Sequence, residues 1–133
     1  MIKQTYLSLN TKERRELINI TDKASAFIKE IGGSGLLNIY IPHTTAGILI
    51  NEDEEGLKRD LLDLFEKLVP ESGKYYHNII DNNADAHQLS VILKNSVCLP
   101  FSDGRLLLGT WQSIFFVELD GPRNRQLVMT ALF

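Results

Sequence analysis

The fold is decided by a segment near the end of the chain, which reads Ser113-Ile114-Phe115-Phe116-Val117-Glu118-Leu119-Asp120-Gly121-Pro122-Arg123-Asn124-Arg125-Gln126-Leu127-Val128-Met129-Thr130-Ala131-Leu132. Its aromatic and β-branched residues predict two strands, at residues 113–120 and 124–132. The turn sequence between them, Gly121-Pro122-Arg123, predicts that they form an antiparallel hairpin. The first strand is apolar on both faces, which is typical of a strand covered on both sides.

The rest of the chain contains six more strand patterns and three helix patterns. The strands are predicted at residues 2–9, 15–20, 36–41, 46–50, 97–101 and 105–108. The helices are predicted from the cap Thr21 to the stop Gly32-Gly33, through Leu57–Leu68 before Pro70, and at residues 84–95 with Asn83 as cap. Because the strands cluster at both ends, the pattern favours an α+β fold over a doubly wound sheet.

The composition excludes several classes of protein. The chain has 133 residues, which fit a single domain spanning residues 1–133. Its formal net charge of −3 provides no broad positive field, so we expect no nucleic-acid partner. No apolar run approaches the roughly 18 residues of a membrane span, so we expect no membrane partner. The first residues lack the apolar core of a secretion signal and Cys98 has no partner for an intrachain disulfide, so we expect a cytoplasmic location.

The first candidate for chemistry is His43, which follows the strand at 36–41. Period-two alternation places its ring on the core-facing side, where it needs a polar partner such as Thr44 or Thr45. The run Asn51-Glu52-Asp53-Glu54 follows the next strand, and we expect it to return to the same rim of the sheet. A capping box explains this run equally simply, and for Asp53 and Glu54 we favour capping.

The other two histidines, His77 and His87, flank a segment rich in amides and carboxylates. It contains Asp81, Asn82, Asn83 and Asp85. One loop could bring His77 back to His87, and such groups suit a divalent metal site or acid–base chemistry. From spacing alone, the alternative is as strong: Asn83 and Asp85 cap and charge the start of a helix while the histidines are solvated.

A third group of polar residues lies in and beside the predicted hairpin. Glu118 shares a face with Ile114 and Phe116, so its carboxylate needs a partner. Arg123 and Arg125 share a face of the following strand, and they form either a structural ion pair with Glu118 or an anion clamp with one arginine free for phosphate. Before the hairpin, we expect Trp111 to be a core anchor and Gln112 to face a ligand.

Together, several separate motifs resemble the YjbQ-like family, which is described as secondary thiamine-phosphate synthases. These motifs occur in order over nearly the whole chain: Pro42-His43-Thr44-Thr45-Ala46, Asn51-Glu52, Asp81-Asn82-Asn83-Ala84-Asp85-Ala86-His87, Gly104-x-Leu106-x-Leu108-Gly109-Thr110-Trp111-Gln112 and Glu118-x-Asp120-Gly121-Pro122-Arg123-x-Arg125. The resemblance implies an α+β domain with a mostly antiparallel, β-sandwich-like core and about three helices. It also implies a homotrimer with clefts between subunits, often with a bound divalent metal, which we expect to be Zn or Mg.

The activity implied by the resemblance joins a hydroxymethylpyrimidine diphosphate to a thiazole phosphate and releases diphosphate. A metal and Arg123 or Arg125 would stabilise the leaving group. We expect catalytic roles for His43, His87, Glu118 and Arg123, substrate binding by Thr44, Asn51, Gln112 and Arg125, and metal ligation by His43, His77, His87 and Asp81. The alternative function is a metal- or phosphometabolite-binding protein whose synthase activity is incidental.

Overall fold

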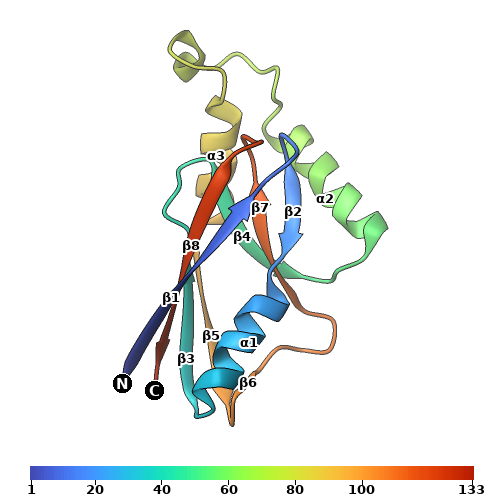
Figure 1. Ribbon diagram of the computed structural model, residues 1–133. Helices are drawn as coiled ribbons and strands as arrows, with labels where there is room; N and C mark the ends of the chain where they lie inside the picture. Colours follow the sequence, from blue (N-terminus) through green and yellow to red (C-terminus); the bar gives the residue numbers. More distant parts are fainter.

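The computed structural model describes all 133 residues. All the predicted strands and helices are present, with ends shifted by one or two residues (Figure 1). In chain order the elements are β1 (Ile2–Asn10), β2 (Glu16–Asn19), α1 (Thr21–Ile31), β3 (Gly35–Tyr40), β4 (Ala46–Asn51), α2 (Glu55–Leu68), the 3₁₀ helix η1 (Tyr76–Ile79), α3 (Ala84–Leu93), β5 (Ser96–Ser102), β6 (Arg105–Leu106), β7 (Ser113–Glu118) and β8 (Asn124–Leu132).

The strands form two antiparallel sheets, which confirms the α+β prediction. One sheet has five strands in the order β1-β8-β3-β5-β6, and the other has three in the order β2-β7-β4. The longest pairing joins the two ends of the chain, because β1 and β8 run in register from Ile2 opposite Leu132 to Asn10 opposite Asn124.

The predicted hairpin is wrong. β7 and β8 follow each other in the chain but lie in different sheets, and the link between them contains a cis Gly121-Pro122 bond. The reason lies in the two side-chain patterns. β7 is buried along both faces and takes the central place in its sheet, whereas in β8 buried residues alternate with more accessible ones. The apolar face of β8 therefore packs against β7 across the core instead of pairing with its edge.

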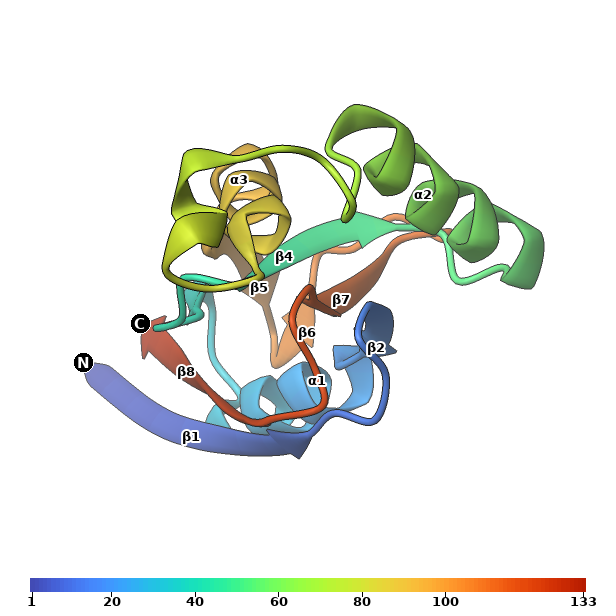
Figure 2. The same ribbon diagram turned by 90° about the horizontal axis from the view of Figure 1, so that it is seen from above.

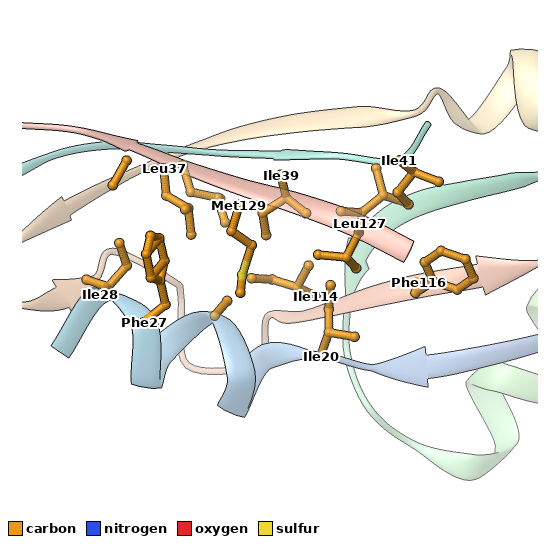
Figure 3. Packing of buried hydrophobic residues seen from close by; sticks show 14 of the residues in the cluster. Ile20, Phe27, Ile28, Leu37, Ile39, Ile41, Ile114, Phe116, Leu127 and Met129 are labelled. Carbon is orange, nitrogen blue, oxygen red and sulfur yellow. The ribbon is translucent and has the colours of Figure 1, made fainter. Parts of the chain in front are cut away.

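Two apolar layers hold these elements together. The larger lies between the five-stranded sheet, the inner face of the three-stranded sheet and α1, where Phe27 and Ile28 meet Leu37 and Met129 (Figure 3). The smaller covers the other face of the three-stranded sheet, where Val117 and Leu119 pack against Phe65 of α2 and Leu89 of α3. Seen from above, α2 and α3 lie on one side of β4 and β7, and α1 lies on the other (Figure 2).

The helix ends follow the sequence signals only in part. Gly32 ends α1 with a φ of 83°, as predicted, but Thr21 does not cap this helix because its hydroxyl accepts a hydrogen bond from the Ile114 amide. Glu54 caps α2 by accepting from the Leu57 amide, whereas Asp53 instead binds Asn19 and Lys58. No helix of the structure combines the length and the apolar character needed to cross a membrane.

Candidate functional site

An open polar pocket lies where the loop after β3 meets the C-terminal half of α3. Its volume is about 450 Å³. Its lining contains two imidazoles, one ammonium group and no carboxylate, contributed by His43, Thr44, His87, Ser90, Val91, Lys94, Asn95 and Ser96. Three of the residues expected at the site, His43, Thr44 and His87, are therefore brought together although they come from different elements.

His43 is held against the start of β8. Its Nε2 lies 3.0 Å from both the amide nitrogen and the carbonyl oxygen of Gln126. Burial and the nearby Arg125 guanidinium lower the pKa of His43 below its ordinary value. The imidazole is therefore favoured in its neutral form, in which it can both donate and accept a hydrogen bond.

His77 and His87 are in direct contact, so one loop does bring His77 back to His87, which was one of the two alternatives left open by the sequence. Their ring centroids are 4.7 Å apart and the ring planes meet at 74°, an edge-to-face arrangement. His77 comes from η1 and His87 from α3, so the amide-rich loop between them turns the chain back on itself. Both rings line a second pocket of about 630 Å³ beside Lys74, Tyr75 and Tyr76. Because His87 lines both pockets, the two are neighbours.

Glu118 and Arg125 form a buried ion pair between the two sheets, which confirms the structural interpretation for these residues. Arg125 Nε lies 2.8 Å from Glu118 Oε1, and Arg125 Nη2 contacts Glu118 Oε2 and the Thr45 hydroxyl. Thr11 donates a further hydrogen bond of 2.6 Å to Glu118. Burial disfavours the ionised carboxylate, but the hydrogen bonds from Arg125 and Thr11 outweigh it and lower the pKa of Glu118.

The structure does not form the predicted anion clamp from Arg123 and Arg125. Arg125 has only 4% of its side chain exposed, whereas Arg123 is 51% exposed and bound to Asp120 by a 2.8 Å ion pair. Arg123 lines a separate open pocket with Thr11, Pro122 and Asn124, and neither this arginine nor Glu118 lines the pocket that contains His43. Arg123 and Glu118 are thus not assembled with the histidines in one chain.

Asn51 and Gln112 lie away from the other candidates, and the expectation that Asn51 returns to the rim beside His43 is wrong. In β4, Ala46 is opposite Glu118 while Asn51 is opposite Ser113, so Asn51 and Gln112 sit at the far end of the three-stranded sheet. Gln112 accepts a hydrogen bond from the Gly109 amide. Trp111 is 73% exposed, so it is not the core anchor that we predicted.

The predicted metal ligands do not form a complete site within one chain. No group of three or more His, Cys, Asp or Glu side chains is placed to hold a metal ion. Asp81 is exposed and accepts a hydrogen bond from the Asn82 amide. His77 and His87 are the two predicted ligands in contact. Because structural and catalytic zinc sites use three or four protein ligands, the residues of a single chain do not fit a zinc site.

Two features of the site escaped the sequence analysis. Lys94 lines the polar pocket with φ 77° and ψ 166°, a conformation that glycine adopts readily and other residues rarely. Asp85 is fully buried and binds both Arg14 and Arg15, which anchors the first turn of α3. Consecutive arginines and a lone lysine at a helix end are common in sequences, so no sequence pattern singles them out.

The chain is similar to known proteins over nearly its whole length. The model of the family described as UPF0047 protein YjbQ-like matches residues 5–132. A UPF0047 protein of Archaeoglobus fulgidus is 47% identical over 126 residues, which cover 95% of this chain and 98% of the relative. The UPF0047 protein YugU of Bacillus subtilis is 43% identical over 90% of this chain and 91% of its own length.

Solved structures agree with the sequence comparisons. The crystal structure of a YbjQ-like protein of unknown function from Sulfolobus solfataricus superimposes with a TM-score of 0.96 at 35% identity, covering 98% of this chain and 96% of that one. A YjbQ/UPF0047 protein from Clostridium acetobutylicum gives a TM-score of 0.92 at 35% identity, covering 96% and 99%. The chain therefore belongs to the YjbQ-like, or UPF0047, protein family.

Proposed function

We propose that the polar pocket binds the phosphate groups of a small phosphorylated metabolite. The observation that carries this proposal is the lining of the pocket, in which His43, His87 and Lys94 are accompanied by hydroxyl and amide groups and by no carboxylate. Such a set of donors suits an anion, because no lining side chain repels it. Because the chain has a formal net charge of −3 and no broad positive field, binding of an anion depends on a local set of donors such as this one.

The reaction that we propose for this site is that of a secondary thiamine-phosphate synthase. The bond between the pyrimidine methylene carbon and a diphosphate oxygen breaks, and the thiazole nitrogen forms the new bond to that carbon. Diphosphate leaves with the electron pair, so negative charge grows on the leaving group. The imidazoles of His43 and His87 and the ammonium of Lys94 stabilise that charge by hydrogen bonding.

Glu118 and Arg125 act as positioning residues in this proposal. Their buried ion pair holds the loop that carries Thr44 against β8, because Arg125 also binds the carbonyl and the hydroxyl of Thr45. Arg123, which is half exposed, is a candidate to reach a substrate phosphate from the separate pocket that it lines. We assign no step to a divalent metal, since one chain does not complete its ligand set.

The homotrimer, the sandwich-like character of the core and the cytoplasmic location remain predictions. The homotrimer is supported by large apolar side chains left exposed beside the second pocket, since Tyr76, Ile79 and Ile80 of the η1 region are 95%, 86% and 86% exposed. Apolar groups exposed to this degree are typical of an interface. A second copy packed here would enclose the open site between subunits.

The proposed reaction is tested by measuring diphosphate release with each substrate alone and with both together. A synthase releases diphosphate only when both substrates are present. His87→Ala is expected to abolish turnover while the variant keeps its folded secondary structure by circular dichroism, and turnover retained in His87→Ala would reject the role of His87. Repeating the assay with a chelator tests the metal that the sequence resemblance implied, and turnover retained under chelation would reject a role for that metal.

The second candidate is a phosphometabolite-binding protein whose synthase activity is incidental. The ion pair between Glu118 and Arg125 favours this function. Because the Glu118 carboxylate is bound to Arg125, it is not free to stabilise a cation that develops on the substrate. Binding of the phosphorylated substrates without diphosphate release would select this function over the synthase.

A further inference from the structure

Behind the second pocket lies a chain of hydrogen bonds that starts at a buried carboxylate. Asp120 is 7% exposed and accepts a 2.8 Å hydrogen bond at Oδ2 from Asn83 Nδ2. An ionised carboxylate only accepts hydrogen bonds, so the NH₂ end of the Asn83 amide must face it. The carbonyl end of this amide, Oδ1, consequently faces His77 at 3.1 Å from Nε2.

This order of donors and acceptors decides which ring nitrogen of His77 carries the proton. An amide carbonyl oxygen only accepts, so Nε2 of His77 must donate. The lone pair of the neutral ring is then at Nδ1. The ionised carboxylate of Asp120 fixes this order of donors and acceptors. Arg123 Nη2 lies 2.8 Å and Arg14 Nε 3.5 Å from that carboxylate, and both guanidinium groups favour its ionised form.

The surroundings of His77 indicate what this lone pair can bind. The second pocket has aromatic walls from Tyr75, Tyr76 and the two imidazoles, and it adjoins the polar pocket at His87. Flat aromatic walls suit a flat ring, and an acceptor beside them suits a ring that carries an N–H donor.

We propose that Asp120 and Asn83 are positioning residues that fix His77 as the Nε2-protonated tautomer, so that Nδ1 accepts a hydrogen bond from the amino group of a flat heteroaromatic ligand. This inference rests on the proposed function for its ligand, because it places the ring of an aminopyrimidine substrate in the second pocket and its phosphate groups in the polar pocket. The tautomer itself follows from the hydrogen bonds of this chain alone.

The tautomer is tested first in the unmodified protein, by long-range ¹H–¹⁵N correlation of the histidine rings at a pH where they are neutral. The expected result is a His77 ring protonated at Nε2. Protonation at Nδ1, or an even mixture of both forms, overturns the proposal. Asn83→Leu is expected to produce a mixture. Asp81→Asn changes a side chain that binds the Asn82 amide and keeps the backbone hydrogen bond from Asp81 to the His77 carbonyl, so it is expected to leave the tautomer unchanged.

The ligand is tested with a pair of phosphate-free probes, 4-aminopyrimidine and pyrimidine. Since one net hydrogen bond contributes about 1 kcal/mol, the amine should improve affinity by roughly fivefold and perturb the His77 ring signals. In Asn83→Leu this ratio should fall to about one. Equal affinities in the unmodified protein overturn the assignment of the pocket. A correct tautomer with amine-dependent binding but no diphosphate release refutes the synthase and leaves this inference standing.

Discussion

The ion pair between Glu118 of β7 and Arg125 of β8 joins the two sheets. The two side chains are 0% and 4% exposed. Glu118→Gln leaves Arg125 buried without its counter-charge, so we expect the free energy of unfolding to fall by about 3 kcal/mol. The matched control is Glu30→Gln, which breaks an exposed pair with Lys3 and should cost less than about 1 kcal/mol. Urea denaturation of both variants measures the difference, and equal losses would contradict the structural role of the buried pair.

Glu118 also makes stability depend on pH. Burial raises the pKa of Glu118, but the hydrogen bonds from Arg125 and Thr11 outweigh it and hold the pKa in the folded protein below the ordinary value. The stabilisation is therefore complete above about pH 4.3, the ordinary pKa of a glutamate, and is lost as the pH falls through the lower folded-state value. Thermal unfolding between neutral and acid pH should show a steeper loss in the unmodified protein than in Glu118→Gln. Parallel curves for the two proteins would contradict this assignment.

The contacts of single residues were predictable where burial of a charged group requires a partner close by. A carboxylate in phase with Ile114 and Phe116 had to be paired, and the structure pairs it. Arg125 lies in phase with the buried Leu127 and Met129 of β8, whereas Arg123 precedes the strand and stays half exposed. Which arginine would reach Glu118 depends on how the two sheets face each other, and this cannot be worked out from alternation within one strand.

At the scale of elements, the end of α3 holds Lys94 in a strained conformation. Its backbone is fixed by hydrogen bonds, since its amide donates to Ser90 at 2.9 Å and its carbonyl accepts from Ile48 at 3.2 Å. Gly47 allows this close approach, because a Cβ there would lie 3.1 Å from the Lys94 carbonyl oxygen.

Lys94→Gly should therefore stabilise the protein. The relief of roughly 1–3 kcal/mol of backbone strain exceeds the entropic cost of a glycine, about 0.5–1 kcal/mol, so we expect a net gain of about 1 kcal/mol in the free energy of unfolding. Lys29→Gly, in the last turn of α1, is the control and should lose about 1 kcal/mol. Chemical denaturation measures both changes, and a loss at position 94 would mean that Lys94 is not strained.

The elements themselves were predictable, but their pairing was not. Period-two patterns and turn residues located all the strands. The turn sequence Gly121-Pro122-Arg123 predicted a hairpin, yet β8 pairs with β1 and β3 instead. Local turn chemistry was outweighed by burial. One face of β7 is covered by α2 and α3, and β8 covers the other face because it lies in the opposite sheet.

At the scale of the whole molecule, the exposed apolar residues beside the second pocket predict self-association. The unmodified protein should sediment as a trimer, and replacing Ile79 and Ile80 together by serine should shift it toward monomer. Leu107→Ser is the control, since Leu107 is 58% exposed but lies in the loop between β6 and β7. A monomeric unmodified protein would refute the predicted homotrimer.

The positions of candidate site residues were predictable within one loop. They were not predictable where they depend on how the strands are arranged in a sheet. The contact of His77 with His87 follows from a polar loop that leads into α3. Asn51 was misplaced because β4 carries it about 17 Å from Ala46, given roughly 3.3 Å per residue in a strand. The sequence marks the order of polar residues along the chain, but the direction of each strand decides at which end of the sheet they lie.

The central claim is that the polar pocket binds phosphate groups, and calorimetric titration with inorganic diphosphate in metal-free buffer tests it most directly. The unmodified protein should bind diphosphate, and His87→Ala should bind it about tenfold more weakly, which corresponds to about 1.4 kcal/mol. Lys29→Ala, on α1 and outside the pocket lining, should bind it unchanged. No binding by the unmodified protein, or equal affinity in His87→Ala, would contradict the claim.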